Sequence, residues 1–183
     1  MFKNRCFKNY REYKTTVEAR NAFIESKKKL FDVKQWSALP GYTATFEVYN
    51  PVQQKFHSEI KVGYYIKISF SKLLPHNWVK ITDIFKSDTL AFIKVRPARD
   101  PNKNNNQIAH FLVENASSTF KVEIKGHTIF GYEVGCDEFI NNKGEQAGNR
   151  KIINTIIAIG GWLGIQNLQW NKLTNYLVHK TEP

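Results

Sequence analysis

The spacing of apolar residues along this chain changes from helical to extended and back to helical. Residues 17–30 place their apolar side chains on one side of a helix and their charged side chains on the other. From about residue 44 to residue 134, apolar and polar positions alternate, most clearly over 62–70, which predicts β-strands. Residues 149–178 return to helical spacing, with a kink expected at the Gly160–Gly161 pair.

Turn-forming residues divide the extended region into short strands. The expected strands are 44–49, 62–70, 78–86, 89–95, 108–114, 120–124 and 130–134, after a further short strand at 10–16. Ser87 and Asp88 form a tight link of the kind that joins the two strands of a hairpin. Parallel strands need long crossover connections, which the pattern lacks, so we expect an antiparallel sheet.

The long helix near the end of the chain determines the predicted fold class. A helix that follows a run of antiparallel strands buries its apolar stripe against one face of their sheet. Trp170, Leu173 and Leu177 continue that stripe after the glycine pair. We therefore predict an α+β fold in which a curved antiparallel sheet grips the helix of residues 149–178.

The 183 residues are expected to form a single domain over 1–183. Residues 1–9 mix cations with aromatic side chains, and we expect a basic N-terminal arm there. Residues 96–107 combine prolines with a run of asparagines, which predicts a flexible surface loop. A short helix or turn over residues 32–39 is expected to follow the first helix.

Composition excludes several classes of protein. Apolar residues make up 42% and aromatic residues 14% of the chain, too much for a disordered protein. No apolar run reaches the roughly 20 residues of a membrane-spanning helix. The N-terminus lacks an apolar signal segment, so we expect a cytoplasmic protein. Cys6 and Cys136 are expected to be free thiols, and the histidines show no metal-ligand spacing.

Inward-facing positions of the predicted sheet and helix are candidates for the wall of a ligand cavity. These candidates are Trp36, Tyr64, Ile66, Ile68, His110, Phe120, Phe130, Tyr132, Ile156, Ile159 and Leu163. Binding pockets have mostly apolar walls with a few polar groups, as this set would provide. The same pattern is typical of a filled core, which is the commoner outcome.

Two groups of titratable residues are candidates for chemistry. His110 lies in an expected strand, where an inward-facing imidazole can act as a base or bind a ligand through a hydrogen bond. An exposed or structurally paired histidine is the commoner case. Asp137 and Glu138, beside Cys136, are candidates for an acidic cluster at a pocket mouth, but a solvated turn is the simpler explanation.

The chain resembles the START-like superfamily, also called SRPBCC or Bet v 1-type, whose members share a helix-grip fold. The resemblance is carried by residues 23–36, where Asp32 precedes Trp36, by the strand beginning Gly63-Tyr64-Tyr65-Ile66, and by the glycine-interrupted final helix. It covers residues 10–177. The N-terminal arm and the asparagine-rich loop depart from the pattern. The resemblance implies a cavity between sheet and helix that binds lipids, hormones or polyketides, and in some members catalyses reactions.

Three functional hypotheses follow. The first is a protein that binds a small apolar ligand between the sheet and the final helix, without cofactor, metal or catalytic residue. The second is an enzyme of cyclase or hydrolase type on the same scaffold, with His110, Tyr132 or Asp137 converging on the cavity. The third uses the net charge of +11, through the N-terminal arm and the lysines at 27–29, to bind nucleic acid or an anionic surface. No specific nucleic-acid partner is expected, because the chain carries no recognisable nucleic-acid-binding motif.

Overall fold

The computed structural model describes residues 4–41, 44–52, 54–55, 59–70, 75–104, 107–141 and 162–183. The strands in these ranges are β1 (Arg5–Glu12), β2 (Thr45–Tyr49), β3 (Tyr65–Ser69), β4 (Asn77–Lys86), β5 (Leu90–Pro97), β6 (Ser117–Lys125) and β7 (Thr128–Cys136). The helices are α1 (Thr16–Phe31), the 3₁₀ helix η1 (Val33–Ala38) and α4 (Trp162–Leu177). The seven strands form one antiparallel sheet in the order β1–β7–β6–β5–β4–β3–β2.

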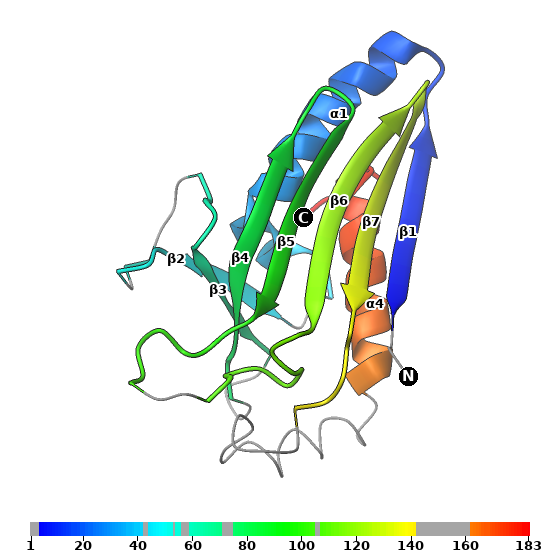
Figure 1. The fold of residues 1–183 in the computed structure, drawn as a ribbon. Helices are drawn as coiled ribbons and strands as arrows, with labels where there is room; N and C mark the ends of the chain where they lie inside the picture. Colours follow the sequence, from blue (N-terminus) through cyan, green and yellow to red (C-terminus); the bar gives the residue numbers. More distant parts are fainter. Residues whose placement is uncertain are drawn as a thin grey trace.

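Both long helices lie on the same face of this sheet (Figure 1). The long strands β4 to β7 bend along their length, and the short strands β2 and β3 run across the lower end of β4 (Figure 1). A register shift between Ile81 and Asp83 marks an irregularity in the β4–β5 ladder, which increases local twist and curvature. The predicted α+β helix-grip architecture is confirmed.

The first helix and η1 are held together by local hydrogen bonds. Thr15 caps α1: its Oγ1 accepts from the backbone N–H of Glu18, and its own N–H donates to the Glu18 carboxylate. Phe23 and Leu30 of α1 are buried on the sheet. Trp36 of η1 donates from Nε1 to the carbonyl of Lys29 at 3.0 Å, which orients its indole toward the concave side of the sheet.

The final helix packs against β1 and β7. Trp170, Leu173 and Leu177 are buried, as the sequence pattern predicted. Gly131 of β7 permits close approach, because a Cβ there would lie 2.9 Å from the backbone oxygen of Thr174. Asn9 of β1 donates from Nδ2 to Thr174 Oγ1 at 2.8 Å, which sets the position of the helix over the sheet edge.

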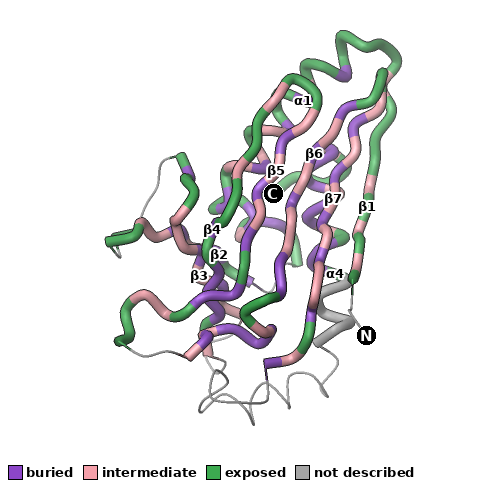
Figure 2. Tube along the Cα trace, viewed as in Figure 1, coloured by how far each residue is buried: buried purple, intermediate pink, exposed green. Residues whose placement is uncertain are grey.

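The face of the sheet opposite the helices is covered by its own lysines. Buried and half-buried residues alternate along β5, β6 and β7 (Figure 2). On the half-buried side, Lys8 Nζ lies 4.6 Å from the ring centre of Phe130, and Lys121 Nζ lies 4.1 Å from that of Tyr132. These cation–π contacts let apolar rings occupy a solvent-facing surface while the charged groups stay hydrated.

Two local predictions were wrong. The first strand covers Arg5–Glu12 instead of 10–16, so residues 5–9 are not an arm. The start of β1 was hard to predict because this strand lies at the edge of the sheet and its apolar alternation is weak. Its end was placed too late because Thr15 is the N-cap of α1. Residues 108–114 form only isolated bridges, because Phe111 and Leu112 pack in a small separate cluster with Ala116. Residues 149–161, including the glycine pair, lie outside the described residues.

Replacing Gly131 with Ala should destabilise the protein by about 1–3 kcal/mol, since the added methyl group meets a backbone carbonyl that cannot move without shifting α4. Urea denaturation measures this free energy of unfolding. Thr119→Ala, on the outer face of β6, is the control and should cost under about 1 kcal/mol. Equal effects of the two substitutions would contradict the proposed close packing of α4.

Candidate functional site

A small apolar pocket lies on the concave side of the sheet, between η1, α4 and the strands β2 to β6. Its volume is about 40 Å³. Apolar side chains form most of the wall, and His110 and Ser118 are its polar members. The residues that line it are Trp36, Phe46, Ile66, Ile68, Phe70, Val79, Val95, His110, Phe111, Leu112, Ser118, Phe120 and Trp170.

Four aromatic rings from four elements meet at this pocket. Trp36 of η1 lies 5.7 Å from Phe46 of β2 and 4.9 Å from Phe120 of β6, measured between ring centres. Phe120 in turn lies 5.3 Å from Trp170 of α4. Their tilted and edge-on orientations are favourable for aromatic pairs. The pocket therefore forms where the sheet, η1 and the C-terminal helix join.

One wall of the pocket is irregular in structure. Phe70 packs both against the main core and against the small cluster of Phe111, Leu112 and Ala116. Asn77 Oδ1 accepts from the backbone N–H of Phe111 at 3.1 Å, and the backbone N–H of Asn141 donates to the carbonyl of Phe111 at 2.7 Å, so single bonds take the place of a continuous sheet ladder there. This part of the wall depends on side-chain packing more than the strand walls do.

The imidazole of His110 is buried and stacks on Phe111, with ring centres 4.5 Å apart. Its Nδ1 accepts a hydrogen bond from the backbone N–H of Leu112 at 3.0 Å. A nitrogen that accepts carries no proton, so this bond selects the tautomer with hydrogen on Nε2. His110 thus contributes to the structure of the irregular wall and presents a polar edge to the pocket.

Two carboxylic acids, in β7 and in the turn after it, lie next to β6, the strand that contributes Ser118 and Phe120 to the pocket wall. Glu133 is fully buried, and burial together with the nearby Glu138 raises its pKa to about 8. Ser118 and Arg5 lower that pKa to a lesser extent. Although Ser118 is close enough to act on this pKa, neither carboxyl oxygen of Glu133 has a hydrogen bond of acceptable geometry within the described ranges. A hydrogen bond requires alignment as well as proximity, so Ser118 is a polar neighbour of Glu133 and not its hydrogen-bond partner.

Glu138 reaches Glu133 because the chain reverses after β7. Asp137 adopts a left-handed backbone conformation, with φ of 54°, and Glu138 then folds back over Gly135. A Cβ at position 135 would lie 2.5 Å from Glu138 Oε1, so a larger residue there would require this carboxylate to shift. Arg5 Nε lies 3.3 Å from Glu138 Oε2 and balances its charge.

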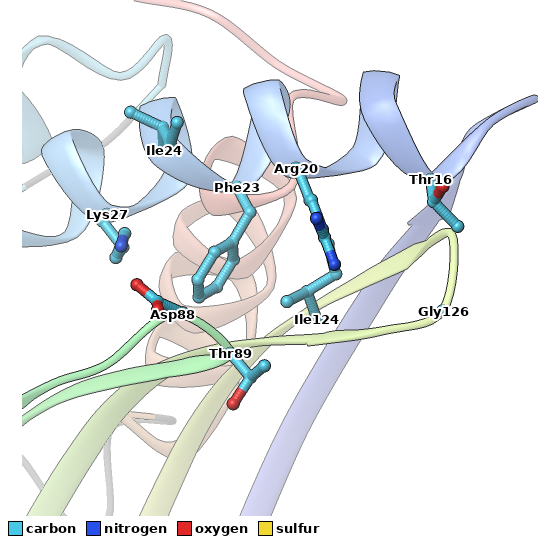
Figure 3. A pocket seen from close by; sticks show the side chains of 9 residues that line it. All are labelled: Thr16, Arg20, Phe23, Ile24, Lys27, Asp88, Thr89, Ile124 and Gly126. Atoms are coloured by element: carbon cyan, nitrogen blue, oxygen red, sulfur yellow. The ribbon is translucent and has the colours of Figure 1, made fainter.

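A larger groove lies on the surface at the other end of the sheet (Figure 3). It has a volume of about 440 Å³ between α1 and the turns that join β4 to β5 and β6 to β7. Arg20, Lys27 and Asp88 contribute charged side chains to it (Figure 3). It is an open, polar surface feature, and it lacks the apolar enclosure typical of small-molecule sites.

The structure brings together five of the predicted site residues. Trp36, Ile66, Ile68, His110 and Phe120 line the pocket. Their role in ligand binding stays a prediction.

The other predicted site residues lie elsewhere. Tyr64 packs against the core without lining the pocket. Phe130 and Tyr132 lie on the outer face, so their inward assignment was wrong. Ile156 and Ile159 are outside the described residues, as is the side chain of Leu163.

The sequence interpretation missed Glu133 because the apolar residues of β7 suggested the opposite face. Phe130, Tyr132 and Val134 are the large side chains of this strand, yet Ile129, Gly131 and Glu133 face inward. The small residues at 131 and 135 were the available signal, since glycine in a strand marks a close approach. They flank Glu133 on the same face of the sheet.

No family model matches this chain, and no curated protein matches it. Among solved structures, the chain is similar to hypothetical protein jhp0584 from Helicobacter pylori, with a TM-score of 0.55, 9% identity, and coverage of 96% of this chain and 87% of that chain. This likeness concerns the fold alone.

Weaker similarities extend to two plant proteins. For norcoclaurine synthase from Thalictrum flavum, solved with dopamine and hydroxybenzaldehyde, the TM-score is 0.49 at 11% identity, over 100% of this chain and 90% of that chain. For the ginseng major latex-like protein 151 from Panax ginseng, it is 0.45 at 10% identity, over 98% and 99%. The START-like resemblance is confirmed as one of fold, by the strand order and by the helices on the concave face.

None of the helices in the described ranges is long and apolar enough to cross a membrane. Nor does any group of three or more His, Cys, Asp and Glu side chains among those residues have the arrangement of a metal site.

The stability of the protein should fall as the pH rises toward the pKa of Glu133. The folded protein keeps the Glu133 proton to about pH 8, whereas the unfolded chain releases it near its ordinary, lower pKa of about 4. The stabilising contribution of Glu133 is therefore complete below the pKa of the unfolded chain. It is lost as the pH rises from that pKa to the folded pKa of about 8, which lowers the free energy of unfolding by an amount on the order of a few kcal/mol. Glu133→Gln should abolish this slope in urea denaturation measured across the window.

Glu123→Gln is the matched control. Burial raises the pKa of Glu123, but hydrogen bonding to Lys125 and the charge of Lys121 outweigh it, so the net direction is down. Its contribution is therefore present at neutral pH and lost as the pH falls through the folded pKa, the opposite direction to Glu133. A slope that survives in Glu133→Gln would show that another group causes it.

Proposed function

We propose that this protein binds a small, mostly apolar molecule in the pocket between the sheet, η1 and α4. The supporting observation is an apolar pocket, at the point where three parts of the fold meet, with a few polar groups and a buried acid of raised pKa beside it. That combination is the usual form of a small-molecule site.

The volume of the pocket limits how a ligand enters. Drug-sized ligands occupy roughly 300–1,000 Å³, and a water molecule occupies about 30 Å³ of the liquid. At about 40 Å³, the pocket has little more than the volume of one water molecule. A ligand therefore takes the place of wall side chains, and half-buried Phe70, between the two hydrophobic clusters, is the side chain that moves.

The three residues named in the enzyme hypothesis are not brought together in one site. His110 lines the pocket, Tyr132 lies on the outer face of the sheet, and Asp137 forms the turn after β7. These three residues do not converge on one space. A reaction would require at least two groups within reach of the same substrate atom.

The cations that motivated the nucleic-acid hypothesis make contacts within the chain. Lys27 donates to the carbonyl of Ser87, Lys28 pairs with Glu25, and Lys29 pairs with Glu182. In the N-terminal strand, Arg5 pairs with Glu138 and Lys8 lies over Phe130. These contacts favour structural roles for the residues that suggested a polyanion partner.

Substitutions in the pocket wall should change the binding of a small aromatic probe, fluorobenzene, followed by ¹⁹F NMR titration. Val95→Leu adds a methylene group to the wall and should weaken binding by about tenfold or more. Phe70→Ala removes the moving side chain and should strengthen binding by a similar factor, because apolar cavities bind such compounds.

Val122→Leu is the control for this experiment. Val122 is as buried as Val95 and lies in the same core, but it does not line the pocket. The same methylene added there should leave probe affinity unchanged. If Val95→Leu and Val122→Leu weaken binding equally, the probe does not bind in this pocket.

A further inference from the structure

The buried acid on β7 lies on the same face of the sheet as two residues of the pocket wall. Glu133 stands directly opposite Phe120 of β6 in the β6–β7 register, and Ser118 lies one pair further along the same face. Phe120 and Ser118 both line the pocket. Directly opposed residues of antiparallel strands point to the same side of the sheet, so Glu133 lies next to these two wall residues, on the same face.

The surroundings of Glu133 leave its hydrogen-bonding capacity unused. It has no exposed surface, and neither oxygen has a hydrogen bond of acceptable geometry within the described part of the chain. Gly131 and Gly135 flank it on the same face and supply no side chain to contact it. A buried polar group without a partner destabilises the folded protein, so its presence suggests that a bound molecule supplies the partner.

The charges around Glu133 define what that partner can be. Glu138 faces it from the turn after β7, and Arg5 of β1 pairs with Glu138, so these two groups are already balanced. Ser118 of β6 is the neutral polar group on the other side. A second carboxylate would be repelled by Glu138, and an ammonium group would require Glu133 to ionise in an apolar surrounding.

We propose that Glu133 is the polar anchor of the pocket, and that its carboxylic acid donates a hydrogen bond to an uncharged oxygen acceptor, such as a ketone, on an otherwise apolar ligand. This rests on the proposed function, since it presumes that a ligand enters the pocket. The raised pKa of Glu133 agrees with it, because a carboxyl that keeps its proton at neutral pH can donate.

The test compares acetophenone with ethylbenzene, two probes of nearly the same shape, of which only the first carries a carbonyl oxygen. Affinities are measured by ligand-observed NMR for wild type, Glu133→Leu and Glu133→Gln, at about pH 6 and about pH 9.5. The carbonyl stretching frequency of bound acetophenone, from isotope-edited infrared spectra, reports directly on hydrogen bonding to that oxygen. Circular dichroism confirms that each variant is folded at both pH values.

In wild type at the lower pH, acetophenone should bind about threefold to tenfold more tightly than ethylbenzene, the ratio that one hydrogen bond provides. The preference should vanish at the higher pH, where Glu133 has lost its proton. Glu133→Gln retains an N–H donor and should keep the preference at both values. Glu133→Leu should bind both probes equally and lose the lowered carbonyl frequency.

The outcomes distinguish this inference from the proposed function. If both probes bind with equal affinity in wild type, or if Glu133→Leu retains the preference, Glu133 is not the anchor, while the pocket remains a binding site. If neither probe binds to wild type or to Phe70→Ala, the proposed function fails, and the anchor role fails with it.

Discussion

The contact between Trp36 and Phe120 is the interaction on which the rest of the concave side depends. Trp36 is buried, and the hydrogen bond from its indole to the carbonyl of Lys29 near the end of α1 fixes the orientation of the ring. Phe120 also packs against Trp170 of α4. The first helical region, the middle of the sheet and the last helix thus meet through three rings, and the pocket is the space that these rings leave.

A tightly packed interior and a binding site are compatible here because the walls differ in stiffness. The strand walls of the pocket are held by continuous backbone ladders, whereas the segment around Phe111 is held by isolated backbone hydrogen bonds and by the side chains of Asn77 and Asn141. Fewer backbone pairs mean a lower cost of local opening. Movement should therefore concentrate on one side of the pocket, while the aromatic contacts on the opposite side persist.

The sequence pattern predicted the architecture well because the architecture depends on periodicity. Strong alternation identified the long strands, and the stripe of Trp170, Leu173 and Leu177 identified the buried side of α4. It was harder to predict which face of β7 points inward. Lysine side chains cover Phe130 and Tyr132, so these large rings can lie on the outer face. Periodicity shows that the two faces of a strand differ in polarity. Which of the two faces the core depends on residues far away in the sequence.

The pairing of β1 with β7 has a consequence for how the chain assembles. Each residue of β1 faces a partner more than a hundred positions later in the chain. During synthesis, β1 therefore emerges long before β7, its neighbour in the sheet, and the central hairpins can form locally in the meantime. Closing so long a loop is entropically slow, so docking of the N-terminal strand, with its arginines and lysine keeping the unpaired edge hydrated, belongs among the last events of folding.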